Sequence, residues 1–378
     1  MRIGIDARFW GPIGKGLGRY TQKLIENLEK IDRENQYFIF LRKENFDDFV
    51  SVGENFKKVL ADYHWYSWEE QIKFPRLLRS YDLDLVHFPH FNIPIFYRGK
   101  FVVTIHDLIL LHFPTVRNTT LNPLFYKIKF FCYRKVIRTA LRKSERIITV
   151  SKFTQKDILS EFPLISKEKI AVTYEATENF CFLSLSEAEK VLKKYGIMKP
   201  YLLYVGNAYP HKNLERLALA FQKVRNFFPE MRLVLVGKKD YFYRRLESFI
   251  TERKIAGVVL AGFVSDEELD LVFKEARLYV WPSLYEGFGL PPLEAMAKGT
   301  PVVSSREACM PETLGEAVGY FDGKKVEDMA NVIGDILGQE EKRQDLIHRG
   351  YEQVKKYSWK KMGEETLAIY KDIFRKVS

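Results

Sequence analysis

The feature that most restricts the fold of this chain is a repeated alternation of short apolar runs with amphipathic stretches. In the first half, runs rich in Val, Ile and aromatic residues predict strands at 2–6, 37–41, 83–88, 101–105, 147–150 and 170–174. Helical patterns lie between several of them, at 17–30, 68–79, 121–142 and 152–161. A strand followed by a helix, repeated many times, predicts a doubly wound parallel sheet.

The same alternation restarts near residue 200. It predicts strands at 201–206, 233–237, 258–261, 278–281 and 301–304, and helices at 183–194, 214–227, 265–275, 291–298, 340–357 and 359–374. Ser265 and Glu268 predict a capping box at the start of one helix. The fold class is therefore α/β, with two Rossmann-like parallel-sheet domains at 1–180 and 181–357, followed by a C-terminal helical segment at 358–378.

The net charge restricts the classes of molecule that this protein is expected to bind, but it does not select one of them. The 378 residues carry a formal net charge of +11, which favours anionic partners: nucleic acid, anionic lipid or phosphorylated small molecules. The three cysteines are few, odd in number and widely spaced, which argues against a disulfide framework or a zinc site. No signal peptide and no apolar run of membrane-spanning length is found, so we expect a cytoplasmic protein.

The strongest motif runs from Leu284 to Glu294 and follows the predicted strand 278–281. Its two glycines allow the backbone to approach a ligand closely, and its two prolines suit the opening of a helix. Backbone N–H groups at such a helix start favour negative charge. Glu286 and Glu294 flank the turn as acceptors for sugar hydroxyls. The alternative is a tight turn with two solvated glutamates.

Two further motifs follow predicted strands. Residues 204–214 form a strand, a Gly-containing loop and a helix start, where Lys212 can reach a diphosphate as a point charge. Residues 14–20 form a glycine-rich loop that resembles a dinucleotide fingerprint only loosely. Each could also be an ordinary exposed loop.

Histidines follow two neighbouring strands of the first domain. His106 and Asp107 end the strand 101–105, where they could position an acceptor hydroxyl or hold a donor sugar. His87 and His90 lie at the end of the preceding strand, and for them a structural role is favoured.

Together these motifs resemble glycosyltransferase family 4, a large family of retaining enzymes of the GT-B fold, in which two Rossmann-like domains face a cleft. The resemblance covers nearly the whole chain. It implies that Glu286 contacts the donor sugar, that Glu294 binds the nucleotide ribose and that Lys212 binds the diphosphate. The backbone would contact sugar and phosphate at four consecutive residues, Gly287, Phe288, Gly289 and Leu290.

The resemblance assigns further positions. The phosphate loop includes Gly206 and Asn207, where many members carry an arginine in place of Asn207. The N-terminal glycine loop that faces the donor includes Gly16 and Gly18. His106 would contact the donor sugar, Val264 lies in the loop that contacts the base, and the helix 359–374 would cross back onto the first domain. We take His106, Asp107 and Glu286 as candidate catalytic residues.

The resemblance thus implies a retaining hexosyltransferase with a nucleotide diphosphate sugar as donor and a glycan or lipid-linked acceptor in cell-surface polysaccharide synthesis. The residues of the motifs are most similar to those of bacterial mannosyltransferases, which suggests GDP-mannose as the donor. We expect no metal and no other cofactor, because no Asp, His or Cys cluster has metal-ligand spacing. The alternatives are a nucleotide-sugar isomerase or phosphorylase on the same scaffold, or a basic nucleic-acid-binding protein; we expect no nucleic-acid partner.

A basic segment at 121–146 predicts contact with an anionic membrane at the inner face of the plasma membrane. It holds eight basic residues and the single acid Glu145. Helical spacing predicts a core stripe of Leu121, Leu124, Ile128, Phe131 and Cys132, and a second, exposed face of Lys127, Phe130, Arg134, Arg138 and Arg142. An aromatic ring among cations suits a lipid interface. The alternatives are a solvated face or a site for a phosphorylated acceptor.

Overall fold

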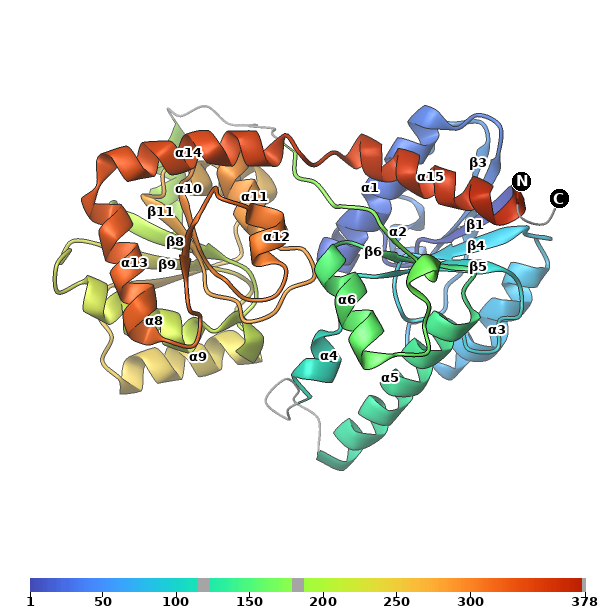
Figure 1. The fold of residues 1–378 in the computed structure, drawn as a ribbon, viewed down its shortest axis with the longest axis horizontal. Helices are drawn as coiled ribbons and strands as arrows, with labels where there is room; N and C mark the ends of the chain where they lie inside the picture. The colour runs from blue at the N-terminus through green and yellow to red at the C-terminus, as the bar shows by residue number, and fades with distance from the viewer. Residues whose placement is uncertain (115–122, 179–186, 376–378) are drawn as a thin grey trace. The chain divides into compact units, whose positions relative to one another are not determined.

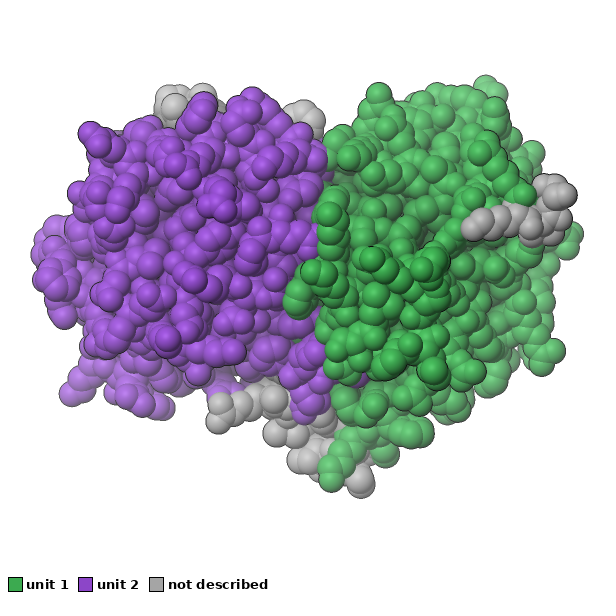
Figure 2. All heavy atoms as spheres, in the orientation of Figure 1, with its two compact units in different colours: residues 1–110, 121–175, 358–378 green, residues 111–120, 176–357 purple. Residues whose placement is uncertain are grey.

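The computed structural model describes residues 1–114, 123–178 and 187–375, and its chain divides into two compact units (Figure 2). Unit 1 consists of residues 1–110, 121–175 and 358–378, and unit 2 of residues 111–120 and 176–357. The C-terminal segment therefore belongs to the same unit as the N-terminus.

Unit 1 contains a seven-stranded parallel sheet in the order β3-β2-β1-β4-β5-β6-β7. Its strands are β1 (Arg2–Asp6), β2 (Gln36–Leu41), β3 (Phe56–Leu60), β4 (Leu85–Phe88), β5 (Phe101–Ile105), β6 (Arg146–Thr149) and β7 (Ile170–Val172). The central strands are buried on both faces: every residue of β4 and β5 is buried. Such continuous apolar strands are typical of parallel sheets that helices cover on both sides.

The helices of unit 1 are α1 (Lys15–Ile31), α2 (Lys43–Phe46), α3 (Trp68–Arg79), α5 (Pro123–Lys143), α6 (Lys152–Glu161) and α15 (Trp359–Arg375). The short helix α4 (Ile109–His112) spans residues of both units. Right-handed crossovers place α1 on one face of the sheet and α3, α5 and α6 on the other. The C-terminal helix α15 packs beside α1 (Figure 1).

Unit 2 contains a six-stranded parallel sheet in the order β10-β9-β8-β11-β12-β13. Its strands are β8 (Tyr201–Val205), β9 (Arg232–Val236), β10 (Val258–Gly262), β11 (Leu278–Trp281), β12 (Val302–Ser305) and β13 (Gly319–Phe321). Its main helices are α7 (Ala188–Lys194), α8 (Leu214–Val224), α9 (Tyr241–Glu252), α10 (Asp266–Lys274), α11 (Leu290–Ala297), α12 (Met310–Leu314), α13 (Val326–Gly338) and α14 (Glu340–Val354).

The strand orders create one topological switch point in each unit. In unit 1 the order reverses between β1 and β4, and in unit 2 between β8 and β11. Successive connections leave these two strands for opposite faces of the sheet, so the loops at their carboxyl ends part and leave room for a ligand. The fold therefore marks the loops after β1 and β4, and after β8 and β11, as candidate sites.

The structure confirms the α/β fold class with two Rossmann-like parallel sheets. Five predicted elements have the bounds of the observed ones: 2–6, 101–105, 278–281, 68–79 and 152–161. The residue patterns did not predict the strands β3 and β13 or the helices α2, α4, α9, α12 and α13. The predicted helix 183–194 is observed from Ala188, and 183–186 lie outside the described residues.

The predicted capping box at α10 is wrong. Ser265 is the N-cap residue, but its hydroxyl makes no hydrogen bond to a helix N–H group. It donates instead to the carboxylate of Glu268, which also binds Lys194 and Tyr195. The charged lysine and the phenol are stronger partners for the carboxylate than the N-cap N–H would be.

The predicted core stripe of α5 is also wrong. Ile128 and Phe131 are 54% and 70% exposed, and Cys132 is exposed as well. The buried side chains are Tyr133, Ile137, Ala140 and Leu141. Leu121 and the side chain of Leu124 lie outside the described residues. Two apolar stripes fit helical spacing in this segment, and the one at 133–141 is buried.

Candidate functional site

The switch point of unit 2 brings together two motifs that are 74 residues apart in the chain. The loop after β8 ends in a short 3-10 turn, Pro210–Lys212, and the segment 282–289 follows β11. The N–H group of Leu284 donates to the carbonyl of His211 across 2.7 Å, which ties the two segments together. The parallel pairing of β8 with β11 therefore positions both motifs at one sheet edge.

Lys212 and Glu286 meet at this edge. The Lys212 Nζ lies 2.6 Å from the Glu286 Oε1, and both side chains are 11% exposed. The ammonium also lies 4.8 Å from the centroid of the Trp281 ring. A cation and a carboxylate side by side can bind a diphosphate and the hydroxyls of an adjoining sugar.

Backbone conformation fixes the loop that carries Lys212. Gly206 has φ 152°, and a Cβ there would lie 2.7 Å from the hydroxyl of Tyr204. Asn213 adopts the left-handed region at φ 63°, and its side-chain amide donates to the carbonyls of Pro282 and Gly323. The side chain of Asn213 thus holds the start of α8 to the segment that carries Glu286.

Asn207 holds the turn between Gly206 and Lys212. Its carbonyl accepts a hydrogen bond of 2.8 Å from the hydroxyl of Tyr204, and its side-chain oxygen accepts one from the N–H of Tyr209. An amide side chain shapes the loop but adds no positive charge to it.

The turn after Glu286 opens α11. Gly289 is the N-cap residue at φ 87°, where a Cβ would lie 2.8 Å from the Cε of Met310. Pro291 and Pro292 occupy the first turn, where they sacrifice no helical hydrogen bond. Gly287 and Phe288 are buried, Leu290 and Glu294 are half-buried, and the ring of Phe288 packs edge-on against Tyr357.

Two further side chains of unit 2 adjoin this edge. His211 is 5% exposed, and its Nδ1 has no hydrogen-bond partner among the described residues. Burial and the neighbouring Lys212 lower the pKa of His211 to about 3, so the imidazole is neutral at physiological pH. Val264 follows Gly262 at the end of β10, and its side chain is buried, which leaves only its backbone for a ligand contact.

In unit 1, the predicted glycine-rich loop is wrong. Gly16 and Gly18 lie in the first turn of α1, which begins at Lys15 directly after a 3-10 turn, Pro12–Gly14. A Cβ on Gly18 would lie 2.0 Å from the carbonyl oxygen of Gly11. The glycine therefore allows α1 to pack on the backbone of the segment before it. Gly16 is exposed with open space around its Cα.

His106 is positioned by hydrogen bonds at both ring nitrogens. Its Nδ1 lies 3.1 Å from the Oε1 of Glu175, and its Nε2 lies 2.9 Å from the carbonyl oxygen of Pro89. Burial alone would lower the pKa of His106, but the hydrogen bond and charge of Glu175 outweigh it, and the pKa is raised. Contact with a ligand through a ring nitrogen would require one of these bonds to break.

Asp107 and the segment 151–154 support this turn. The carboxylate of Asp107 accepts a hydrogen bond of 2.9 Å from the N–H of Ile109. The hydroxyl of Thr154 donates to the carbonyl of His106, and Ser151 caps α6 through the N–H of Thr154. His106 and Asp107 are thus held at the carboxyl end of β5, next to the switch point of unit 1.

His87 and His90 fit the structural role that was favoured for them. His87 is fully buried between the hydroxyls of Tyr370 and Thr104, and its burial lowers its pKa to about 3. Burial likewise lowers the pKa of His90 to about 3. The bond from His87 to Tyr370 ties α15 to β4.

Sequence reasoning missed two functional candidates. Glu175 follows β7, and Trp281 ends β11, so both lie at the sheet edges where ligands bind. The position after a predicted strand, applied to every strand, would have identified Glu175. The stacking of Lys212 on Trp281 depends on the tertiary fold, and nothing in the local sequence indicates it.

Known protein families and curated proteins are similar to this chain. The model of the family "Glycosyl transferases group 1" matches residues 167–353, and that of "Glycosyltransferase Family 4" matches residues 14–177. The chain is 28% identical to the O-antigen chain mannosyltransferase B of Escherichia coli, over 94% of this chain and 96% of that protein. It is 26% identical to the O-antigen chain mannosyltransferase RfbU of Salmonella typhimurium, over 93% and 94% of the two chains.

Solved structures share the fold. Sucrose-phosphate synthase from Thermosynechococcus elongatus matches with a TM-score of 0.77 at 21% identity, over 99% of both chains. HepE from Anabaena, solved in complex with UDP and glucose, matches with a TM-score of 0.72 at 16% identity, over 98% of this chain and 99% of that one. We draw one conclusion from the two sheets, from the paired lysine and glutamate at a switch point, and from both family matches. The chain is a GT-B glycosyltransferase of family 4, group 1, that resembles bacterial mannosyltransferases.

Proposed function

We propose that the enzyme transfers mannose from GDP-mannose to a hydroxyl of a glycan or lipid-linked acceptor in cell-surface polysaccharide synthesis. The observation that carries the proposal is the ion pair of Lys212 and Glu286 at the switch point of unit 2. The choice of mannose is supported by two relatives that are named O-antigen chain mannosyltransferases. A nucleotide diphosphate sugar as donor is also supported by HepE, which was solved with UDP and glucose.

In this proposal unit 2 binds the donor. Lys212 and the N–H groups of Gly289 and Leu290, where α11 starts, stabilise the diphosphate as the bond from its oxygen to the anomeric carbon breaks. Glu286 accepts hydrogen bonds from the sugar, and Glu294 binds the ribose. Gly206 and the backbone of 287–290 contact the phosphates and the sugar, and the backbone of Val264 contacts the base.

The acceptor hydroxyl approaches the face of the sugar from which the diphosphate leaves, so the product retains the anomeric configuration of the donor. The acceptor oxygen bonds to the anomeric carbon, and its proton passes to the departing phosphate oxygen. His106 and Asp107 contribute a charged turn at the end of β5. Proton NMR of the product tests retention, since an inverted anomeric coupling would contradict this geometry.

A nucleotide screen tests the donor. GDP-mannose should raise the melting midpoint more than UDP or ADP sugars, because a ligand that binds the native state stabilises it. Turnover of GDP-mannose should require a saccharide acceptor. A clear preference for a UDP sugar would contradict the mannosyl donor, and turnover without an acceptor would favour an isomerase or phosphorylase.

We also propose that protein cations replace a metal ion, with Lys212 as the main one and no other cofactor. Asn207 adds no charge to the loop. Among the described residues 206–213, Lys212 is therefore the one side chain that brings a positive charge to the loop. Transfer by dialysed enzyme should survive excess EDTA. Loss of activity that Mg²⁺ or Mn²⁺ restores would contradict this proposal.

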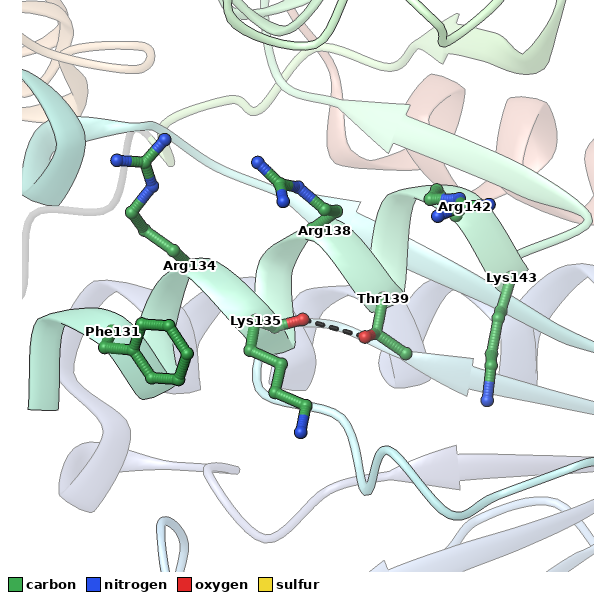
Figure 3. A pocket seen from close by; sticks show the side chains of 7 residues that line it. All are labelled: Phe131, Arg134, Lys135, Arg138, Thr139, Arg142 and Lys143. Carbon is green, nitrogen blue, oxygen red and sulfur yellow. Dashed lines mark hydrogen bonds between the residues drawn. The ribbon is translucent and has the colours of Figure 1, made fainter. Parts of the chain in front are cut away.

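Peripheral contact with an anionic membrane through α5 is a further part of the proposal. Arg134, Arg138, Arg142 and Lys143 are exposed on this helix, and Figure 3 shows them along a pocket that Phe131 also lines. The exposed Ile128 and Phe131 can enter the headgroup boundary while the cations meet lipid phosphates, each contributing about 1 kcal/mol. No helix among residues 1–114, 123–178 and 187–375 is long and apolar enough to cross a membrane.

Liposome flotation tests this contact. Binding should require anionic lipid, weaken at high salt and fall in two variants, Arg134→Glu with Arg138→Glu and Ile128→Ser with Phe131→Ser. A matched control changes Lys360→Glu and Lys361→Glu, two exposed cations of α15 in the same unit. If the protein stays unbound at low salt, or if the control reduces binding as much as the α5 variants, the membrane contact is wrong.

A further inference from the structure

The segment from the end of β3 to the first residue of α3 is unusually aromatic. Tyr63, His64, Trp65, Tyr66 and Trp68 lie within six residues at the carboxyl end of a parallel strand. Trp65 is anchored, because its ring stacks on Phe9 with centroids 4.6 Å apart and lies 4.8 Å from the Arg42 guanidinium carbon. Tyr66 is 57% exposed. The loop thus combines a fixed ring with a presented one.

The backbone of Tyr66 has an unfavourable conformation. Its φ is 64°, in the left-handed region that a bulky aromatic residue rarely adopts. The conformation is held by a hydrogen bond of 2.7 Å from the Tyr66 N–H to the Oε2 of Glu70. Such backbone strain persists only where the surroundings impose it, and it is concentrated at functional sites.

A buried ionic network imposes this strain. Glu70 is fully buried, and its Oε1 accepts hydrogen bonds from Arg8 at 2.6 Å and from the side-chain amide of Asn92 at 2.7 Å. Arg8 is also fully buried and binds Asp6 at the end of β1. Its guanidinium donates to the carbonyl of Tyr63 as well. Asp6 at the end of β1 and Asn92 in the loop after β4 therefore fix the position of Tyr66 through Arg8 and Glu70.

Tyr66 adjoins the candidate catalytic turn of the same unit. Its ring centroid lies 6.5 Å from that of Phe91. Phe91 follows His90, and the Pro89 carbonyl accepts the hydrogen bond from His106. One short segment, 89–91, thus contacts both His106 and Tyr66.

We propose that Tyr66 is an acceptor-binding residue, whose ring stacks on a pyranose ring of the acceptor glycan and whose hydroxyl faces the sugar's polar edge. An exposed aromatic ring offers an apolar face to sugar C–H groups and a polar tip to sugar hydroxyls. Tyr66 is 57% exposed, so its ring is accessible to a ligand. This inference rests on the proposed function, because it names the subsite in which the accepting saccharide binds.

Saccharide binding to the full chain tests the proposal. Methyl α-mannoside, mannobiose and mannotriose are titrated against the wild type and three variants by saturation-transfer NMR. Tyr66→Gly removes the ring and accepts the left-handed backbone without strain, so binding should weaken at least tenfold while the melting midpoint stays level or rises. Tyr66→Phe keeps the stacking face, so binding should weaken by only a few fold.

Trp68→Ala is the matched control, since Trp68 is 80% exposed two residues further along and has an ordinary helical backbone. It should bind the saccharides as the wild type does. The shift in melting midpoint caused by GDP-mannose should be the same in the Tyr66 variants as in the wild type, because the donor site lies in unit 2.

The outcomes separate the two claims. If no nucleotide sugar shifts the melting midpoint of the wild type, the proposed function fails. If nucleotide sugars bind but the wild type binds none of the three saccharides, or Tyr66→Gly binds them as well as the wild type, the acceptor subsite is wrong. An equal loss in Trp68→Ala would also overturn it, because stacking would then belong to any exposed ring of the segment 63–68.

Discussion

Lys212 and Glu286 neutralise each other in a place where neither has much water. Each side chain is 11% exposed, so removing one partner leaves the other as a poorly solvated charge. Breaking a buried pair in this way costs about 3–5 kcal/mol of stability, whereas replacing both charges by neutral groups of similar shape costs much less. Stability therefore depends on the same two side chains that form the proposed donor site.

This coupling gives a prediction for three variants. Lys212→Met should lower both stability and turnover, because it leaves Glu286 unpaired and removes the cation for the diphosphate. Turnover should fall about 10²–10³-fold, since a lost contact to developing charge costs about 3–4 kcal/mol. The double variant Lys212→Met with Glu286→Gln should regain most of the stability, measured by urea unfolding, but none of the turnover. A double variant with restored turnover would contradict the role of Lys212.

His106 has two hydrogen-bond acceptors and so should carry two protons. A carboxylate and a carbonyl oxygen accept from its two nitrogens, which only the imidazolium can satisfy. The other charged or titratable groups that face it are Asp107, His87, His90 and Tyr20. Because the pKa of both His87 and His90 is about 3, neither histidine changes charge near neutral pH.

The pH dependence follows from the direction of the shift. The pKa of His106 is raised above its unfolded value of about 6.5, so its contribution to stability is complete below that pH and is lost as the pH rises through the folded pKa. Glu175→Gln should lower the His106 pKa and flatten this part of the stability profile. NMR titration of the His106 Hε1 signal measures the pKa. An unchanged pKa in the variant would show that Glu175 does not hold the proton.

At the scale of elements, the start of α1 separates a packing glycine from an accessible one. A Cβ on Gly18 would clash with the Gly11 carbonyl at 2.0 Å, whereas a Cβ on Gly16 would meet nothing within 4 Å. Gly18→Ala should therefore destabilise the protein by about 1–3 kcal/mol, in the range of overpacking. Gly16→Ala should fold normally, because alanine favours the helix.

Activity then distinguishes the roles of the two glycines. If the donor approaches the first turn of α1, Gly16→Ala should reduce turnover although its urea midpoint is equal to or above that of the wild type. Steady-state kinetics of both variants, beside their unfolding curves, measure this. Full activity in Gly16→Ala would show that no ligand approaches there, and an undisturbed midpoint in Gly18→Ala would contradict the packing role.

The elements that sequence patterns predicted well are those with one strong physical signal. The apolar strand 101–105 and the amphipathic helix 68–79 have the predicted bounds. A strand buried on both faces is a continuous apolar run, and a helix buried along one stripe has apolar residues at three- and four-residue spacing, so both can be recognised in the sequence. The edge strand β3 was missed since Lys57 and Lys58 interrupt it, and only Phe56 and Val59 are buried. In α5, two apolar stripes gave equal periodicity, and only contact with the sheet selects one of them.

In the candidate site, too, some features follow from local sequence patterns and others depend on the tertiary fold. Lys212 and Glu286 follow predicted strands with glycines nearby, and that local pattern identified them. Their contact, the stacking on Trp281 and the bond from His106 to Glu175 depend on strand order, which residue spacing does not encode. The strained Tyr66 was missed for a related reason: its conformation is imposed by Glu70 and Arg8, whose pairing is tertiary.

At the scale of the whole molecule, the chain passes between its two units more than once. Residues 176–357 belong to unit 2, and the final helix α15 returns to unit 1, where it packs beside α1 and binds His87 through Tyr370. Each unit nevertheless has its own sheet and its own buried core. A ligand of unit 2 should therefore stabilise mainly the backbone of that unit.

Hydrogen exchange with GDP tests this expectation. At 100 times its Kd, a ligand that binds only the native state adds about 2.7 kcal/mol of stability, which slows exchange through unfolding of the binding unit about 100-fold. The core amides of β8 and β11 should slow by this factor, and the loops at 206–213 and 283–289 should gain protection by direct contact. The core amides of β4 and β5 in unit 1 should change little. The double variant Lys212→Met with Glu286→Gln, at the same GDP concentration, should lose most of this protection. Equal slowing in β4 and β5 would show that the two units unfold together, and protection confined to unit 1 would contradict a nucleotide site at the switch point of unit 2.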